Sequence, residues 1–123
     1  MATIKSYSDL QQSKKLAEIL PLESADMFWR HCNLDNLDYP IMQTEFEYIR
    51  NANTPCWSLA SLLNVLPDTI TNNNGIAFKL NIKKNIIEYS NPSLYLIHKF
   101  VKSDNLIDAC VEMIIKLNEL KML

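Results

Sequence analysis

The chain has 123 residues, of which 48% are hydrophobic and 21% charged, and its formal net charge is −2 at pH 7. This composition fits one globular domain over residues 1–123, with enough chain to bury a core, and the negative balance disfavours a general nucleic-acid binder. No apolar run reaches the roughly 18 residues that span a bilayer, and the single glycine, Gly75, excludes most phosphate-cradling loops.

The beginning of the chain predicts one helix followed by one strand. Ser8 and Gln11 have the spacing of a capping box for an amphipathic helix over residues 8–20. Pro21 ends this helix, because the residue before a proline avoids the α region. The short aromatic stretch 25–31 is bounded by turn-forming residues and predicts a strand.

The middle of the chain predicts a loop and two helical segments. Residues 32–43 lack a period and are rich in Asn and Asp, so we expect a loop there. A second capping box favours one or two helical turns over residues 44–50. A clearer helix is predicted over residues 54–66, with Thr54 as the N-cap and Pro55 at the first helical position.

After that helix the hydrophobic period changes from 3.6 to 2, which predicts a three-stranded meander. The strands are expected over residues 76–82, 86–90 and 94–102. We expect a hairpin turn over residues 83–85, with Asn85 in the left-handed conformation. The last strand is apolar on both sides except at His98 and one lysine, which favours a strand covered on both faces.

The stretch 104–121 predicts a helix with Asp104 as its N-cap. Its polar residues fall in one narrow strip, formed by Asp108, Glu112, Lys116 and Glu119, and about two-thirds of the circumference is apolar. The predicted fold class is therefore α+β, with a small antiparallel sheet of three to four strands, three helices, and the C-terminal helix at the centre. The apolar excess near its end marks the residues expected at a dimer contact: Ile115, Leu120 and Met122.

Three blocks of the sequence resemble a family of small uncharacterised proteins from Bacteroides-type gut bacteria and their prophages or mobile elements. The first block is residues 12–27 (QSKKLAEILPLESADM). The second is residues 55–60 (PCWSLA), followed by Leu62-Leu63 and Pro67, and the third is residues 108–115 (DACVEMII). The resemblance covers about a third of the chain. It implies a bacterial or phage-associated setting and gives no catalytic residue.

Three groups of residues could carry chemistry. Cys56 lies in the first turn of a predicted helix, where the helix dipole lowers a thiol pKa, although burial on the apolar face is the commoner fate of a free cysteine. A metal site could use His31, Cys32 and His98, but the paired short spacing of zinc ligands is missing. An acid–base pair or a cation site could use Asp35, Asp38, Glu45 and Glu47, but the spacing of neither is present, which favours a solvated acidic loop.

Lysines gather in the predicted meander, where Glu88 is the single acidic residue between Lys79 and Lys102. These lysines are Lys79, Lys83, Lys84, Lys99 and Lys102. They could bind a phosphate backbone or an acidic protein, or they could protect exposed strands from pairing with other chains. Trp57 falls beside the polar side of its predicted helix, so it is either an interface anchor or packed under a loop.

These patterns favour a non-enzymatic accessory module that acts by protein–protein contact, either with itself as a homodimer or with another protein. One alternative is a nucleic-acid-binding accessory protein that uses the hairpin 79–102, and another is a small thiol enzyme that uses Cys56. We expect no cofactor and no metal. Three cysteines in a chain whose first residues lack a signal-peptide core predict reduced thiols in the cytoplasm.

Overall fold

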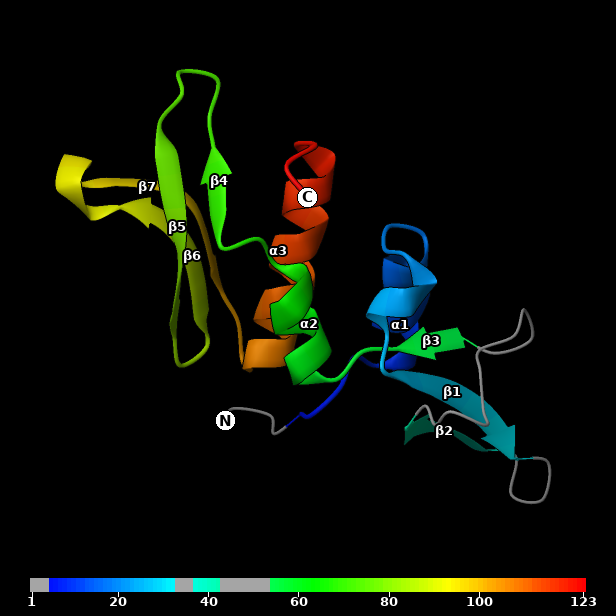
Figure 1. Cartoon of the computed structure of the whole chain (residues 1–123). Helices are drawn as coiled ribbons and strands as arrows, with labels where there is room; N and C mark the ends of the chain where they lie inside the picture. Colours follow the sequence, from blue (N-terminus) through cyan, green and yellow to red (C-terminus); the bar gives the residue numbers. More distant parts are fainter. Residues whose placement is uncertain (1–4, 33–36, 43–53) are drawn as a thin grey trace.

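The computed structural model describes residues 5–32, 37–42 and 54–123, which form three α-helices, two short 3-10 helices and two antiparallel sheets (Figure 1). The predicted α+β class is therefore confirmed. The helical elements are α1 (Leu10–Ala17), η1 (Leu22–Ser24), α2 (Leu59–Val65), η2 (Pro92–Leu94) and α3 (Leu106–Glu119). The strands are β1 (Met27–Cys32), β2 (Leu37–Met42), β3 (Thr54–Cys56), β4 (Thr69–Thr71), β5 (Ala77–Lys83), β6 (Ile86–Asn91) and β7 (Leu96–Lys102).

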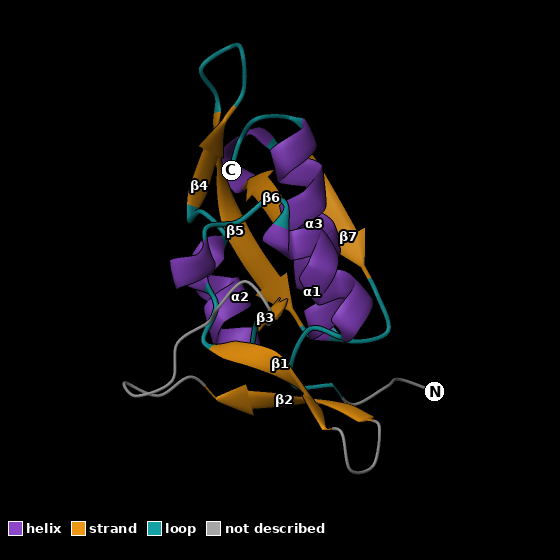
Figure 2. Cartoon of the chain, turned by 90° about the vertical axis from the view of Figure 1, so that its right-hand side faces the viewer, coloured by secondary structure: helices purple, strands orange, loops and turns teal. Residues whose placement is uncertain are grey.

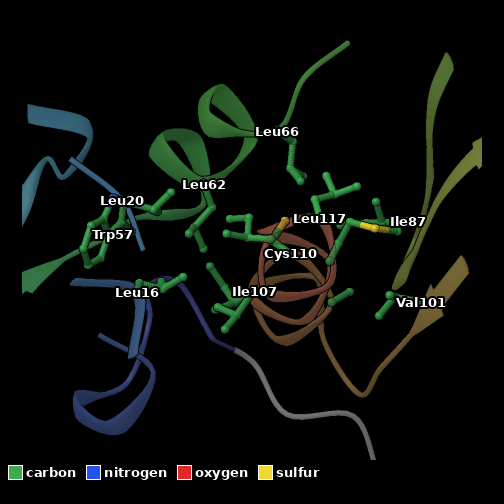
Figure 3. Close-up of a cluster of buried hydrophobic side chains, with 14 of the residues drawn as sticks. Leu16, Leu20, Trp57, Leu62, Leu66, Ile87, Val101, Ile107, Cys110 and Leu117 are labelled. Atoms are coloured by element: carbon green, nitrogen blue, oxygen red, sulfur yellow. The ribbon is translucent and has the colours of Figure 1, made fainter. Parts of the chain in front are cut away.

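Helix α3 lies at the centre of the fold, as predicted. Strands β6 and β7 pack on one side of it, and α2 and α1 pack on the other (Figures 1 and 3). Seven of its side chains are buried: Ile107, Ala109, Cys110, Val111, Met113, Ile114 and Leu117. The wide apolar arc is therefore used within the chain itself, because a helix that is apolar on most sides needs cover on most sides.

Both ends of α3 are capped by the chain. The N-cap is Asn105, one residue after the predicted Asp104, and its side-chain oxygen accepts the N–H three positions further on at 2.8 Å. At the other end Lys121 takes a left-handed conformation with φ 58°, and the Met122 N–H donates to the Leu117 carbonyl at 2.8 Å. This Schellman-type turn folds Met122 back toward the core.

A polar cluster joins the starts of α1 and α3. The Lys5 ammonium donates to Asp108 at 2.7 Å, to Gln12 at 2.8 Å and to Asp9 at 3.1 Å. The Asp108 carboxylate also accepts from Gln12 at 2.8 Å and from Asn105 at 2.9 Å. Burial raises the pKa of Asp108, but these hydrogen bonds and the positive charge of Lys5 together outweigh it, so the pKa lies below its ordinary value.

This cluster predicts an acid-dependent part of the folding stability. A carboxylate with a lowered pKa stabilises the fold above its unfolded pKa of about 3.9, and the contribution is lost as pH falls through the folded value. Asp108→Asn is therefore expected to destabilise the protein at pH 7 and to match wild type once both are in strong acid. Urea midpoints measured from neutral to strongly acid pH test this. Glu112→Gln is the control, because Glu112 forms only an exposed 3.9 Å pair with Lys116.

The larger sheet has the strand order β4-β5-β6-β7, and β5, β6 and β7 confirm the predicted meander. Strand β4 was not predicted, because it has three residues and only Ile70 among them is buried. In the β5–β6 turn it is Lys84, with φ 45°, that adopts the left-handed conformation, and not Asn85 as predicted. The Asn85 side chain instead donates to the Asp104 carbonyl at 3.0 Å.

Among the described residues, the helices and strands cover the larger sheet on one face only. Phe78, Ile87, Tyr89 and Val101 are buried on the face toward α3. All three α-helices lie on that same side of the sheet (Figure 1). Neighbours across antiparallel strands share a face, so the register assigns another set of residues to the opposite face. We call this the open face, and its residues on β5–β7 are Lys79, Asn81, Lys83, Ile86, Glu88, Ser90, Ile97, Phe100 and Lys102.

The prediction that strand 94–102 is covered on both faces is therefore wrong. Its apolar side chains divide between a buried set, represented by Val101, and an exposed set that includes Ile97 and Phe100. The strand is also at the edge of its sheet, so the described residues provide it with one neighbouring strand, β6. The apolar composition of a strand does not show whether the strand lies at the edge of its sheet, where its side chains can be exposed.

The smaller sheet has the order β2-β1-β3, so the first predicted strand exists but belongs to a separate sheet (Figure 2). Strand β2 lies within residues 32–43, which were predicted as loop. It contains Pro40, which cannot donate a backbone hydrogen bond and is tolerated at a sheet edge. The helical turns predicted over residues 44–50 lie outside the described residues.

The starts of α1 and α2 also differ from prediction. The capping box of α1 is formed by Asp9 and Gln12, one residue later than predicted. Residues 54–56 form β3, so Thr54 does not cap α2; Ser58 does, and α2 begins at Leu59. The Asp26 carboxylate fixes this cap, because it accepts the Ser58 N–H at 3.0 Å and the Ser58 hydroxyl.

Candidate interaction surface

Five large apolar side chains within seven residues are exposed around η2 and β7. They are Leu94, Tyr95, Leu96, Ile97 and Phe100, with 95% of Tyr95, 61% of Ile97 and 48% of Phe100 accessible. Single exposed apolar residues are common on protein surfaces, but a group of this size in one segment is typical of an interaction site. No interaction role was predicted for Leu94, Leu96, Ile97 or Phe100, because an apolar strand with no clear alternation is typical of a buried position.

The open face also gathers part of the predicted lysine cluster. Lys79 and Lys83 lie on β5 and Lys102 lies on β7, all on the open face. Lys84 occupies the β5–β6 turn. Lys99 is opposite Tyr89, so it belongs to the other face and does not join the group.

Glu88 is the single acidic residue in residues 69–102, and it lies in the middle of the open face. Its side chain is largely buried among its neighbours, and it accepts a hydrogen bond from Asn81 at 2.9 Å. The Lys83 ammonium is 4.0 Å away. Glu88 therefore offsets part of one lysine charge, and Lys79, Lys83 and Lys102 leave the open face with a net positive charge.

A cavity of about 370 Å³ lies on the open face beneath the tip of the β6–β7 connection. It is lined by Ala77, Lys79, Ser90, Asn91, Pro92 and Ser93. Asn91 holds this tip in place, because its side-chain amide donates to the Ala77 carbonyl at 3.0 Å and its oxygen accepts the Leu94 N–H at 3.2 Å. The cavity is thus formed by the fold of the connection itself.

The residues predicted for a dimer contact on α3 are only partly available. Ile115 and Met122 are half-buried and pack against the core of their own chain. Leu120 is 45% exposed. The apolar excess of the helix end is therefore mostly satisfied within the chain, and only Leu120 remains as an exposed apolar side chain of this predicted set.

Trp57 is fully buried, so it is not a surface anchor (Figure 3). Its ring N–H donates to the Ser24 hydroxyl at 3.0 Å, and its backbone N–H donates to the Ser8 hydroxyl at 3.1 Å. Of the two alternatives for Trp57, the interface anchor is wrong and the buried position is confirmed, although Trp57 does not lie on a helix as predicted. Trp57 follows β3 and precedes the α2 N-cap, and the chain there directs the ring between η1 and the core.

Cys56 is fully buried and lies in β3, so the helix-start argument for a reactive thiol is wrong. Burial raises the pKa of Cys56, although hydrogen bonds with Ser8 and Ser13 oppose the shift. Burial also raises the pKa of Cys110, to about 12. A thiol that is neither accessible nor ionised is a poor nucleophile.

We therefore expect iodoacetamide to leave Cys56 and Cys110 unmodified in the folded protein at neutral pH. Both should react fully in denaturant, which provides the control on the same chain. Peptide mass spectrometry assigns the modification to each cysteine. Rapid alkylation of Cys56 before unfolding would restore the thiol-enzyme alternative.

The other predicted chemical groups are not assembled in the described residues. Within residues 5–32, 37–42 and 54–123, no three His, Cys, Asp or Glu side chains are placed to share a metal ion. The His98 ring packs on Phe78 at 4.9 Å between centroids, and its buried Nε2 has no partner among the described residues. Asp38 is exposed on β2. The remaining candidates lie outside the described positions or side chains: His31, Cys32, Asp35, Glu45 and Glu47.

Comparison of the chain with protein-family models, curated proteins and solved structures found no match in any of the three. The helices in the described part of the chain include none with both the length and the apolar character needed to cross a membrane. The relation to Bacteroides-type and prophage proteins stays a prediction.

Proposed function

We propose that this protein is a non-enzymatic interaction module that binds an acidic, extended segment of another protein on its open face and along β7. The observation that carries the proposal is the group of exposed apolar side chains on and beside a sheet face that is otherwise lysine-rich. Apolar side chains supply the contact area of a protein interface, and the lysines select a partner of opposite charge.

The edge of β7 favours an extended partner. The Ser103 N–H donates to the Asn85 carbonyl at 3.2 Å, which makes these two residues a hydrogen-bonded pair of the antiparallel ladder. Since such pairs alternate along the strands, the backbone groups of Phe100 and Lys102 point away from β6 toward the free edge. A partner strand can pair with these groups while its side chains contact the open face.

The same surface is less suited to nucleic acid. The Glu88 carboxylate offsets part of the charge of Lys83, so the face has fewer free positive charges than a run of phosphates needs. The exposed apolar group is mostly aliphatic, whereas single-stranded nucleic acids bind on aromatic platforms. The negative charge of the whole chain further weakens attraction to a polyanion.

A second copy of the chain fits this surface less well than an acidic partner. Two copies that met through their open faces would bring Lys79, Lys83 and Lys102 of each toward the same residues of the other. Like charges in an interface cost free energy. We also propose that a bacterium or its prophage encodes the protein and that it works in the bacterial cytoplasm, in keeping with the free cysteines Cys56 and Cys110.

Fluorescence anisotropy with three labelled probes tests the proposal. The probes are an alternating valine–glutamate hexapeptide, the matching valine–lysine hexapeptide, and a single-stranded DNA oligonucleotide. We expect binding of the glutamate peptide that weakens with added salt, and much weaker binding of the other two. Preferential binding of the DNA, with a steep salt dependence, would support the nucleic-acid alternative instead.

Sedimentation of the free protein across the micromolar range accompanies these titrations. We expect a monomer. A stable dimer that Leu120→Ser dissociates would contradict the proposal and would place the contact at the end of α3.

A further inference from the structure

We propose that the cavity beneath the β6–β7 tip binds one carboxylate side chain of the acidic partner segment, with Lys79, Ser90 and Ser93 as its polar contacts. This inference rests on the proposed function, because it assigns the point at which the open face recognises the charge of the partner. The ligand is an aspartate or glutamate side chain in an extended polypeptide.

The polar groups of the cavity come from three successive elements. Lys79 lies on β5, Ser90 faces it directly on β6, and Ser93 belongs to η2. Directly opposite residues of an antiparallel pair have Cβ atoms about 4.5–5.5 Å apart, so one small anion can contact both side chains. An ammonium and two hydroxyls supply donors that match a carboxylate, which only accepts hydrogen bonds.

Two of these donors are not used within the described chain. Ser90 is only 9% exposed and lines the cavity, yet its hydroxyl makes no hydrogen bond to another described residue. Lys79 forms no ion pair with the acidic groups of the described segments. The Ser90 oxygen is open to the cavity rather than sealed in the protein, so it is available to a ligand atom.

The cavity is preorganised. Besides the two hydrogen bonds of Asn91, the Tyr95 N–H donates to the Pro92 carbonyl at 3.2 Å, and Tyr95 adopts a left-handed conformation with φ 54°. These contacts fix the rim, so binding requires little ordering of the protein. A preformed site loses less affinity to conformational entropy than a flexible loop does.

The charge of the cavity favours a carboxylate over a phosphate. About 370 Å³ accommodates one acidic side chain and is at the small end for a drug-sized ligand. Among the described residues, Lys79 is the single cation in the lining, which balances the one negative charge of a carboxylate but not the charge of about −2 on a phosphate. Ile97 faces Ser90 on β7 and offers an apolar contact beside the cavity.

The test compares Lys79→Ala, Ser90→Ala and Lys83→Ala in titrations with the valine–glutamate hexapeptide. Lys83 is the matched control, since it lies on the same strand and face and carries the same charge. We expect Lys79→Ala to weaken binding about three- to tenfold and Lys83→Ala less than about twofold. Ser90→Ala should weaken binding about two- to threefold. Equal effects of the two lysine substitutions, or none for either, would overturn the inference.

A second measurement needs no protein variant. We expect a valine–glutamine hexapeptide to lose most of its affinity, and a phosphoserine analogue to bind no better than the glutamate peptide. Tighter binding of the phosphoserine peptide would overturn the choice of carboxylate. If wild type binds no glutamate peptide, the proposed function fails together with this inference. If it binds the peptide and Lys79→Ala has no effect, only the cavity assignment is wrong.

Discussion

Replacing Trp57 by alanine is expected to lower the free energy of unfolding by about 3–5 kcal/mol, the usual cost of truncating a fully buried aromatic side chain. The ring is fully buried and lies beside Leu20 (Figure 3), with its N–H on Ser24 of η1. Its removal leaves a cavity and also leaves the Ser24 hydroxyl without its donor. Urea denaturation followed by far-ultraviolet circular dichroism measures the change.

Trp29→Ala is the matched control for this prediction. Trp29 is half-exposed, with its ring edge-to-face against Tyr7 at 6.0 Å and its ring N–H donating to the Ser13 hydroxyl at 3.0 Å. We expect a smaller loss of stability than for Trp57→Ala. A Trp57→Ala variant that is as stable as wild type would mean that the ring does not occupy the core.

The second large effect is on binding. The double substitution Ile97→Ser and Phe100→Ser is expected to weaken binding of the valine–glutamate peptide by at least about tenfold, because truncated apolar anchors at an interface often cost more than about 1 kcal/mol each. Folding stability should change little, since both side chains are about half or more exposed in the free protein. Anisotropy titration and urea denaturation of the same preparations give the two quantities.

Leu120→Ser provides the control for this binding experiment. Leu120 is exposed to a similar degree and lies at the end of α3, away from the open face. We expect it to bind the peptide as wild type does. If Leu120→Ser abolishes binding and the double variant does not, the interaction surface is on α3.

The sequence predicted those elements whose hydrophobic period is long and regular. The alternation of Phe78, Leu80 and Ile82 identified β5, and the broad apolar arc of residues 106–117 identified a central α3. In both cases burial of one face or of most faces determines the structure. The pattern of apolar residues then indicates directly which faces of the element are buried.

The elements that the sequence did not predict depend on pairing with distant residues. Thr54 and Pro55 suit a helix start, yet residues 54–56 pair with β1 and the helix begins later at Ser58. Local capping patterns near Thr54 and Ser58 are almost equivalent, and the distant Asp26 selects the second by binding its N–H and hydroxyl. Local propensity is a weak guide when a tertiary contact opposes it.

Only the lysines of the candidate surface could be predicted, for a similar reason. The lysine cluster was visible in the sequence, but its division between two faces depends on the strand register. A bulge in the β6–β7 ladder at Tyr89 and Ser90 makes His98 an extra residue and sends Ile97 to the open face. No residue type marks that bulge, so neither the exposed Ile97 nor the cavity at Ser90 could be derived from the pattern alone.

The most direct test of the open face as the interaction surface is a two-dimensional ¹⁵N–¹H spectrum of the protein titrated with the valine–glutamate hexapeptide. Our proposal predicts that the largest shifts occur in β5, β6 and β7, including the amides of Ser90, Ile97 and Phe100, while those of Leu120 and Met122 stay in place. Shifts concentrated at residues 115–123, with the β5–β7 amides unchanged, would contradict it.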